Sequence, residues 1–127
     1  MNLLLDTCAL VWLGMGGGGL GPETRRRIEA APTLYYSSIS AWETARLAKE
    51  GKIELAVPSG EFLADLAGQY GLVSLPPDDE TMLRAAQLPD FHKDPADPII
   101  IATALLRDLP VVTGDVRFPA YGIRTIC

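Results

Sequence analysis

Short apolar runs alternate along the chain with longer segments in which apolar residues recur every three or four positions. The apolar runs show no polar alternation, as expected of strands that are covered on both faces, and they occupy residues 2–5, 34–38, 72–75, 111–113 and 123–126. Helical periodicity fills the segments between them, at residues 7–13, 22–31, 40–50, 61–70, 78–88 and 95–109. This alternation predicts an α/β fold, a three-layer α/β/α sandwich with a mostly parallel central sheet.

Local signals set the expected ends of several helices. Pro22 suits a first helical position. Ser40 and Glu43 have the spacing of a capping box, which predicts a helix that begins at Ser40 and stops at Gly51. The segment GMGGGGLG, which contains the run Gly16–Gly19, predicts a flexible loop because glycine loses much entropy in a helix.

The stretch FHKDPADPIII carries two Asp-Pro pairs directly before an apolar helix. We expect Asp94 to be the N-cap and Pro95 the first helical residue, which places Asp97 one turn into the helix. Pro98 then falls at the fourth helical position, where its missing N–H forgoes the first backbone bond of the helix. His92, the only histidine, is assigned a structural or loop role.

Composition and charge narrow the classes of protein. The 127 residues are expected to form one domain, 1–127, and no apolar run reaches the roughly 20 residues that span a bilayer, so no membrane association is expected. The net charge of -5 argues against a general nucleic-acid binder but permits a nuclease whose acids gather in one metal site. Cys8 and Cys127 form no disulfide framework, which favours the reducing cytoplasm.

Four acidic residues, which we call the four acids, are positioned to meet at one edge of such a sheet. Asp6 and Asp115 follow apolar strands in LLLDT and VVTGD, and Glu43 and Asp97 lie in first turns of helices. The carboxyl ends of parallel strands share one edge, and oxygen ligands without histidine or cysteine select Mg²⁺ or Mn²⁺. A cation would also offset the repulsion between the carboxylates. The chemistry that follows is metal-assisted hydrolysis of a phosphodiester.

Other interpretations remain open at this stage. Each acid taken singly is explained by a cap or a turn. Asp6 also suits the nucleophile of an aspartyl phosphatase or phosphotransferase, although Cys8 stands where such enzymes usually carry a second acid. A receiver-like or PIN-like module that only holds a cation is a further alternative. A receiver domain usually has a lysine after a late strand, and no lysine follows residues 111–113.

The motifs in this order resemble the PIN-domain ribonucleases, specifically the VapC-like toxins of toxin-antitoxin pairs. The resemblance rests on MNLLLDTCALVWL, SSISAWETARLAKEGKIEL, LPDFHKDPADPIIIATAL and VVTGD, and it covers nearly the whole chain. It implies an α/β sandwich and an endoribonuclease that depends on Mg²⁺ or Mn²⁺, with the four acids as its site. It also implies a homodimer and an antitoxin whose tail occupies the acidic groove. Thr113 matches a small hydroxyl residue of the family that positions a water or a ligand, and Asp94 is a supporting candidate.

Three features depart from the family pattern. Cys8 stands where relatives often have histidine, and the glycine run is unusual. Pro98 replaces an arginine that commonly follows the third acid, which removes a cation able to hold Asp97 or approach phosphate. Contacts to RNA are expected from limited basic patches, for which the candidates are Arg25, Arg26, Arg46 and Lys49.

Overall fold

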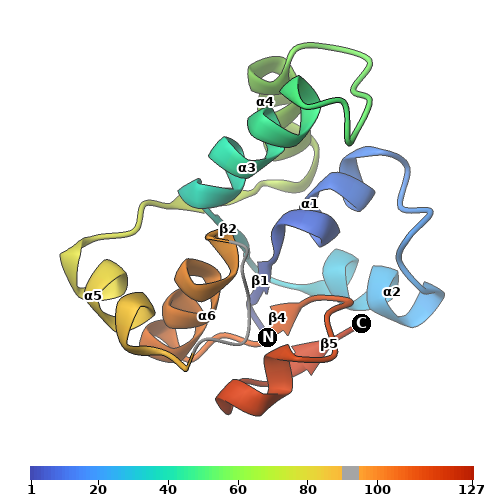
Figure 1. The fold of residues 1–127 in the computed structure, drawn as a ribbon. Coiled ribbons are helices and arrows are strands. Elements are labelled where there is room, and N and C mark those ends of the chain that lie inside the picture. Colours follow the sequence, from blue (N-terminus) through green and yellow to red (C-terminus); the bar gives the residue numbers. More distant parts are fainter. Residues whose placement is uncertain (90–94) are drawn as a thin grey trace.

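The computed structural model describes residues 1–89 and 95–127, and its centre is a parallel five-stranded sheet in the order β3-β2-β1-β4-β5 (Figure 1). The strands are β1 (Leu3–Leu5), β2 (Leu34–Ser37), β3 (Val73–Leu75), β4 (Val111–Val112) and β5 (Thr125–Ile126). Each lies within one of the five apolar runs. The prediction of a mostly parallel sheet is therefore confirmed.

Helices connect these strands. Within the described ranges they are α1 (Thr7–Gly14), α2 (Pro22–Ala30), α3 (Ser38–Lys49), α4 (Ser59–Tyr70), α5 (Asp79–Gln87) and α6 (Ala96–Arg107), with a short 3-10 helix η1 (Phe118–Tyr121). Pro22 is the first residue of α2, as predicted. None of the described helices combines the length and the apolar character needed to cross a membrane.

Neighbouring residues of one strand serve opposite faces of the sheet, which produces the three layers. Leu3 and Leu5 pack with residues of α1, α2 and α4, whereas Leu4 packs with residues of α6 and η1. α5 adds to the second layer through Ala85, which contacts Ile99 and Ala102 of α6. Every residue of β1 and β4 is buried, and such strands, covered on both sides, need no polar alternation, whereas two of the three residues of the edge strand β3 are exposed.

The strand order reverses at β1, the central strand. β2 and β3 lie on one side of it, and β4 and β5 lie on the other. Leu5 pairs with Val112, and the backbone N–H of Asp6 donates to the carbonyl of Val112 at 3.1 Å. The residues that follow β1 and β4 therefore emerge side by side, at the type of position where open α/β sheets bind ligands.

The start of α3 differs from the prediction. The helix begins at Ser38, and the side chain of Ser37, the last residue of β2, accepts from the backbone N–H of Ile39 at 3.3 Å. Ser40 is thus inside the helix, so the predicted capping box with Glu43 was wrong. A strand that leads directly into a helix uses its own last residue as the cap, and this moved the start by two positions. The end was predicted well, since Gly51 follows the helix with a φ of +74°.

The start of α6 also differs. Pro95 is the N-cap rather than the first helical residue, with φ -66° and ψ -21° and no side-chain cap. Asp97 and Pro98 are consequently the second and third helical residues. The first N–H groups of any helix have no intrahelical partner, so Pro98 forgoes no backbone bond and the predicted cost does not arise. Asp94, the predicted cap, and His92 lie outside the described residues.

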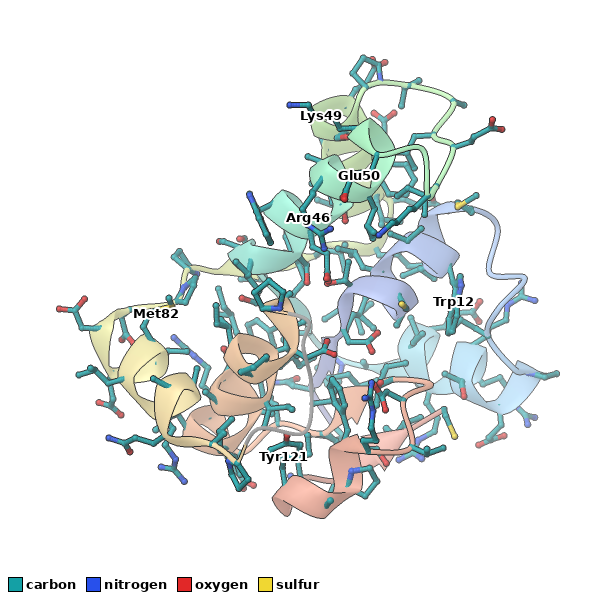
Figure 2. The ribbon with its side chains drawn as sticks, viewed as in Figure 1. Trp12, Arg46, Lys49, Glu50, Met82 and Tyr121 are labelled. Atoms are coloured by element: carbon teal, nitrogen blue, oxygen red, sulfur yellow. The ribbon has the colours of Figure 1, made fainter. Side chains whose placement is uncertain are left out.

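Three positions of the glycine run favour glycine, two by backbone conformation and one by packing. Gly16 and Gly17 adopt φ values of +91° and +77°, which favour glycine. Gly19 lies against the indole, where a Cβ would come within 2.5 Å of Cδ2 of Trp12. In Figure 2, Trp12 lies between α1 and the loop that leads to α2. A Cβ at Gly18, in contrast, would meet nothing within 4 Å.

Replacing Gly19 should therefore destabilise the protein more than replacing its neighbour. We expect Gly19→Ala to lower the free energy of unfolding by about 1–3 kcal/mol, because the new methyl group overpacks a rigid ring. Gly18→Ala should change it by less than about 0.5 kcal/mol. Denaturant unfolding of the two variants measures the difference, and equal stabilities would contradict the packing described for Gly19.

Candidate active site

A cleft of about 1000 Å³ opens at the carboxyl edge of the sheet, and all four acids line it. They reach it from four segments that are distant in the sequence. Asp6 follows β1, Glu43 lies on α3, Asp97 lies in the first turn of α6, and Asp115 follows β4. We call this feature the acidic cleft. The fold thus brings the four acids to one cleft, as expected from the sequence.

Asp6 is held by the helix that it begins. Its Oδ1 accepts from the backbone N–H of Ala9 at 2.8 Å, which makes it the N-cap of α1, and the residue is only 5% exposed. A carboxylate at this position is stabilised by the N–H groups and by the positive end of the helix dipole. The capping role and the cleft position therefore coincide in one side chain, and the cap fixes the direction of the carboxylate.

Glu43 is the most deeply buried of the four acids, at 3% exposure. Nη2 of Arg46, one turn further along α3, lies 3.6 Å from its Oε2. Nη1 of Arg46 also binds Oε2 of Glu50 at 2.8 Å. Burying an ionised carboxylate costs free energy unless a positive charge lies near it. Arg46 supplies that charge to Glu43 from the same helix.

A buried hydrogen bond joins the helices that carry Asp6 and Glu43. The hydroxyl groups of Thr7 on α1 and Ser40 on α3 lie 2.9 Å apart, and both residues are nearly inaccessible to solvent. The two helices also pack against each other. This bond links the residue that follows Asp6 to the helix that carries Glu43.

Asp115 is held by the turn around it. Its backbone N–H donates to Oγ1 of Thr113 at 3.0 Å, and its carboxylate accepts from Nε and Nη2 of Arg117 at 3.1 and 3.0 Å. The hydrogen bond to Asp115 raises the pKa of Arg117, and the negative charge of Asp97 raises this pKa further. Arg117 thus carries positive charge into the cleft that Asp97 lines, although Pro98 replaces the arginine that the resemblance led us to expect next to Asp97.

The fold gathers the four acids in one cleft but does not arrange their side chains as a ligand shell. Among residues 1–89 and 95–127, no group of three or more histidine, cysteine, aspartate or glutamate side chains is arranged to hold a metal ion. Arg46 and Arg117 each bind one of the four carboxylates. The donor set nevertheless consists of oxygen alone, which is the chemistry that hard divalent cations prefer.

Several lining residues were not singled out from the sequence: Trp12, Trp42, Lys52 and Arg117. Trp42 directly precedes Glu43 and Arg117 closely follows Asp115, so proximity to the acids was the available signal. Of the basic candidates, Arg46 lines the cleft. Arg25, Arg26 and Lys49 are not among its lining residues in the described part of the chain.

The sequence is similar to a known protein family and to a named relative. A family model described as PIN domain matches residues 3–123. The chain is 33% identical over 121 residues to a protein named ribonuclease VapC22 of Mycobacterium tuberculosis, with 94% of this chain and 92% of the relative covered.

Two solved structures share the fold. VapBC2 from Rickettsia felis, bound to a promoter DNA fragment, matches with a TM-score of 0.73 at 14% identity, over 99% of this chain and 98% of the other. A toxin-antitoxin complex from Klebsiella pneumoniae matches with a TM-score of 0.66 at 22% identity, over 98% and 96%. At such identities the likeness concerns the fold alone.

The bond between Thr7 and Ser40 yields a test of how the cleft is held together. We expect Ser40→Ala to lower the free energy of unfolding by about 1–3 kcal/mol, because the buried hydroxyl of Thr7 loses its partner. Ser38→Ala on the same helix is the matched control, since the bond between Ser38 and Ser74 is exposed and its loss should cost less than about 0.5 kcal/mol.

A double-mutant cycle completes this test. In the Ser40→Ala background, Thr7→Val should lower the free energy of unfolding only slightly further. The valine removes the Thr7 hydroxyl, which has already lost its partner. Unfolding free energies of the four proteins measure the coupling. Strictly additive losses would show that the two hydroxyl groups do not depend on each other.

Proposed function

The chain belongs to the PIN domain family, and we propose that it is a ribonuclease toxin of a toxin-antitoxin pair that cleaves RNA phosphodiester bonds with Mg²⁺ or Mn²⁺. The observation that carries the proposal is the convergence of the four acids, from four segments, on one cleft. The relative that is 33% identical carries the name ribonuclease, which supports the same activity here.

The residues present fit a divalent cation by their chemistry. The four acids offer only oxygen donors, and two of them, Asp6 and Glu43, are almost fully buried. Carboxylates brought together in a partly enclosed site repel one another, and a cation relieves that repulsion. When bound, a divalent cation supplies an activated water and positive charge beside the leaving oxygen of a phosphodiester.

We assign the roles of the protein groups as follows. The four acids hold the cation. Thr113 and Arg117 position Asp115, and Arg46 positions Glu43 through the contacts described above. Arg117 and Arg46 also carry positive charge into a cleft that must accept the phosphates of RNA.

Partners and location are part of the proposal. We propose a cognate antitoxin as the inhibitor and a homodimer as the assembly, and we place the protein in the cytoplasm. The likeness of fold to a toxin-antitoxin complex supports the first of these. An antitoxin would have to shield the acidic cleft, because that is where the four acids meet.

The proposed activity is tested by incubating the purified protein with total cellular RNA and Mg²⁺ or Mn²⁺. We expect cleavage that EDTA abolishes. Asp6→Asn and Asp97→Asn should each reduce the rate by roughly 100-fold or more, which corresponds to the loss of about 3 kcal/mol of transition-state stabilisation. The rate of appearance of new RNA ends is the measurement.

Asp65→Asn, on the exposed surface of α4, is the matched control and should cleave at the wild-type rate. Unfolding curves exclude loss of structure as the cause of inactivity. Intact RNA with both ions, or full activity in both asparagine variants, would overturn the ribonuclease assignment. Hydrolysis of a phosphate monoester that requires Asp6, with RNA left intact, would instead favour the aspartyl phosphatase interpretation.

A further inference from the structure

Trp42 presents a large aromatic side chain at the acidic cleft. It lies on α3 directly before Glu43, lines the cleft, and remains 49% exposed. It belongs to none of the core clusters formed by the described residues. The exposed indole therefore contributes little to the core, and exposed tryptophans at concave sites are frequent binding residues.

Arg46 holds the indole from one side. Its guanidinium carbon lies 5.1 Å from the centroid of the Trp42 ring, a cation–π contact. The same guanidinium is bound by Glu50 at 2.8 Å and approaches Glu43 at 3.6 Å. In Figure 2, the Arg46 side chain leaves α3 toward the centre of the view, where α1 and α6 begin. The ring is thus oriented before any ligand arrives, which lowers the entropy cost of binding.

Positive charge accompanies this aromatic surface. Arg46 and Lys52 line the same cleft as Trp42, beside the four acids. Single-stranded nucleic acids are bound by this combination, in which an aromatic ring stacks on a base while basic side chains follow the backbone. A base inside a duplex has both faces covered by its neighbours, so only an unpaired base can stack on a protein ring.

We propose that Trp42 is a base-stacking residue that receives an unpaired nucleobase of the RNA next to the phosphodiester bond presented to the four acids. This inference rests on the proposed ribonuclease function and names the feature of RNA that the cleft recognises. Arg46 orients the indole, and Lys52 contacts the adjoining backbone. Stacking tolerates any base, so Trp42 selects for unpaired RNA rather than for a sequence.

The test separates the contribution of the bases from that of the phosphates. Two 12-residue probes are compared, namely single-stranded oligouridine and a ribose-phosphate chain of equal length without bases. Binding is measured by fluorescence anisotropy with Mg²⁺ present, and every protein carries Asp97→Asn so that the probe stays intact. We expect the protein with Trp42 to bind oligouridine about tenfold more tightly than the chain without bases.

Substitution at Trp42 should remove that difference. Trp42→Leu is expected to bind both probes alike, with oligouridine affinity lowered about tenfold, whereas Trp42→Phe should retain most of the preference because a smaller ring still stacks. Met82→Ala is the matched control. It shortens an exposed apolar side chain on α5, outside the lining of the cleft, and should change neither affinity (Figure 2).

A second measurement needs no substitution at Trp42. In Trp12→Phe, where Trp42 is the one remaining tryptophan, oligouridine should quench the emission, and the chain without bases should not. Equal binding of both probes by the protein with Trp42, or an unchanged preference in Trp42→Leu, would overturn the stacking role. Failure of oligouridine to bind would do the same and would leave a protein partner as the remaining reason for the exposed indole.

Kinetics distinguish this inference from the proposed function. In the otherwise unaltered protein, Trp42→Leu should raise KM for unstructured RNA about tenfold and leave kcat within about twofold, since stacking acts on binding. If the wild-type protein cleaves RNA and Trp42→Leu has the same KM, the stacking role is wrong and the ribonuclease stands. If no RNA is cleaved but oligouridine binds through Trp42, the ribonuclease assignment fails and the stacking site stands.

Discussion

The pairing of β1 with β4 is the constraint on which the site depends. Because the sheet order reverses at β1, the chain leaves β1 and β4 at neighbouring points, and the register that pairs Leu5 with Val112 places Asp6 and the Thr113–Asp115 turn side by side. α3 and α6 then bring Glu43 and Asp97 to the same edge. Acids separated by more than a hundred residues in sequence become neighbours through backbone hydrogen bonds between strands only two or three residues long.

Charge compensation is the second requirement of this arrangement. Four carboxylates in one cleft oppose folding unless cations or N–H groups accompany them. The protein supplies both kinds of partner. The backbone N–H of Ala9 holds Asp6, Arg46 accompanies Glu43, and Arg117 binds Asp115, while the charge of Asp97 also acts on Arg117. A metal ion held by the four acids, as proposed above, would compete with Arg46 and Arg117 for the same carboxylates.

Both tryptophans of the chain line the cleft, but their surroundings and their exposure to solvent differ. Trp12 is enclosed by glycine, since a Cβ on Gly19 or Gly114 would come within 2.5 and 3.3 Å of its ring. Trp42 is left half exposed, with Arg46 against one face. Gly19 of the glycine run therefore serves the packing of Trp12, and Trp42 is the more exposed of the two tryptophans at the cleft.

The sequence by itself determined the class of fold, the places of the five strands, and which four acids reach the cleft. Hydrophobic periodicity and the position of an acid after a strand or near the start of a helix are local properties. Local signals also misled at the helix starts. Ser40 had the spacing of a cap but serves as the partner of Thr7, and Pro95 precedes its helix. Only the tertiary structure decided the strand order, the bond between Thr7 and Ser40, and the different environments of Trp12 and Trp42. Each of these features depends on contacts between segments that are distant in the sequence. Such contacts form only when the layers of the fold pack together, and no local pattern in the sequence encodes them.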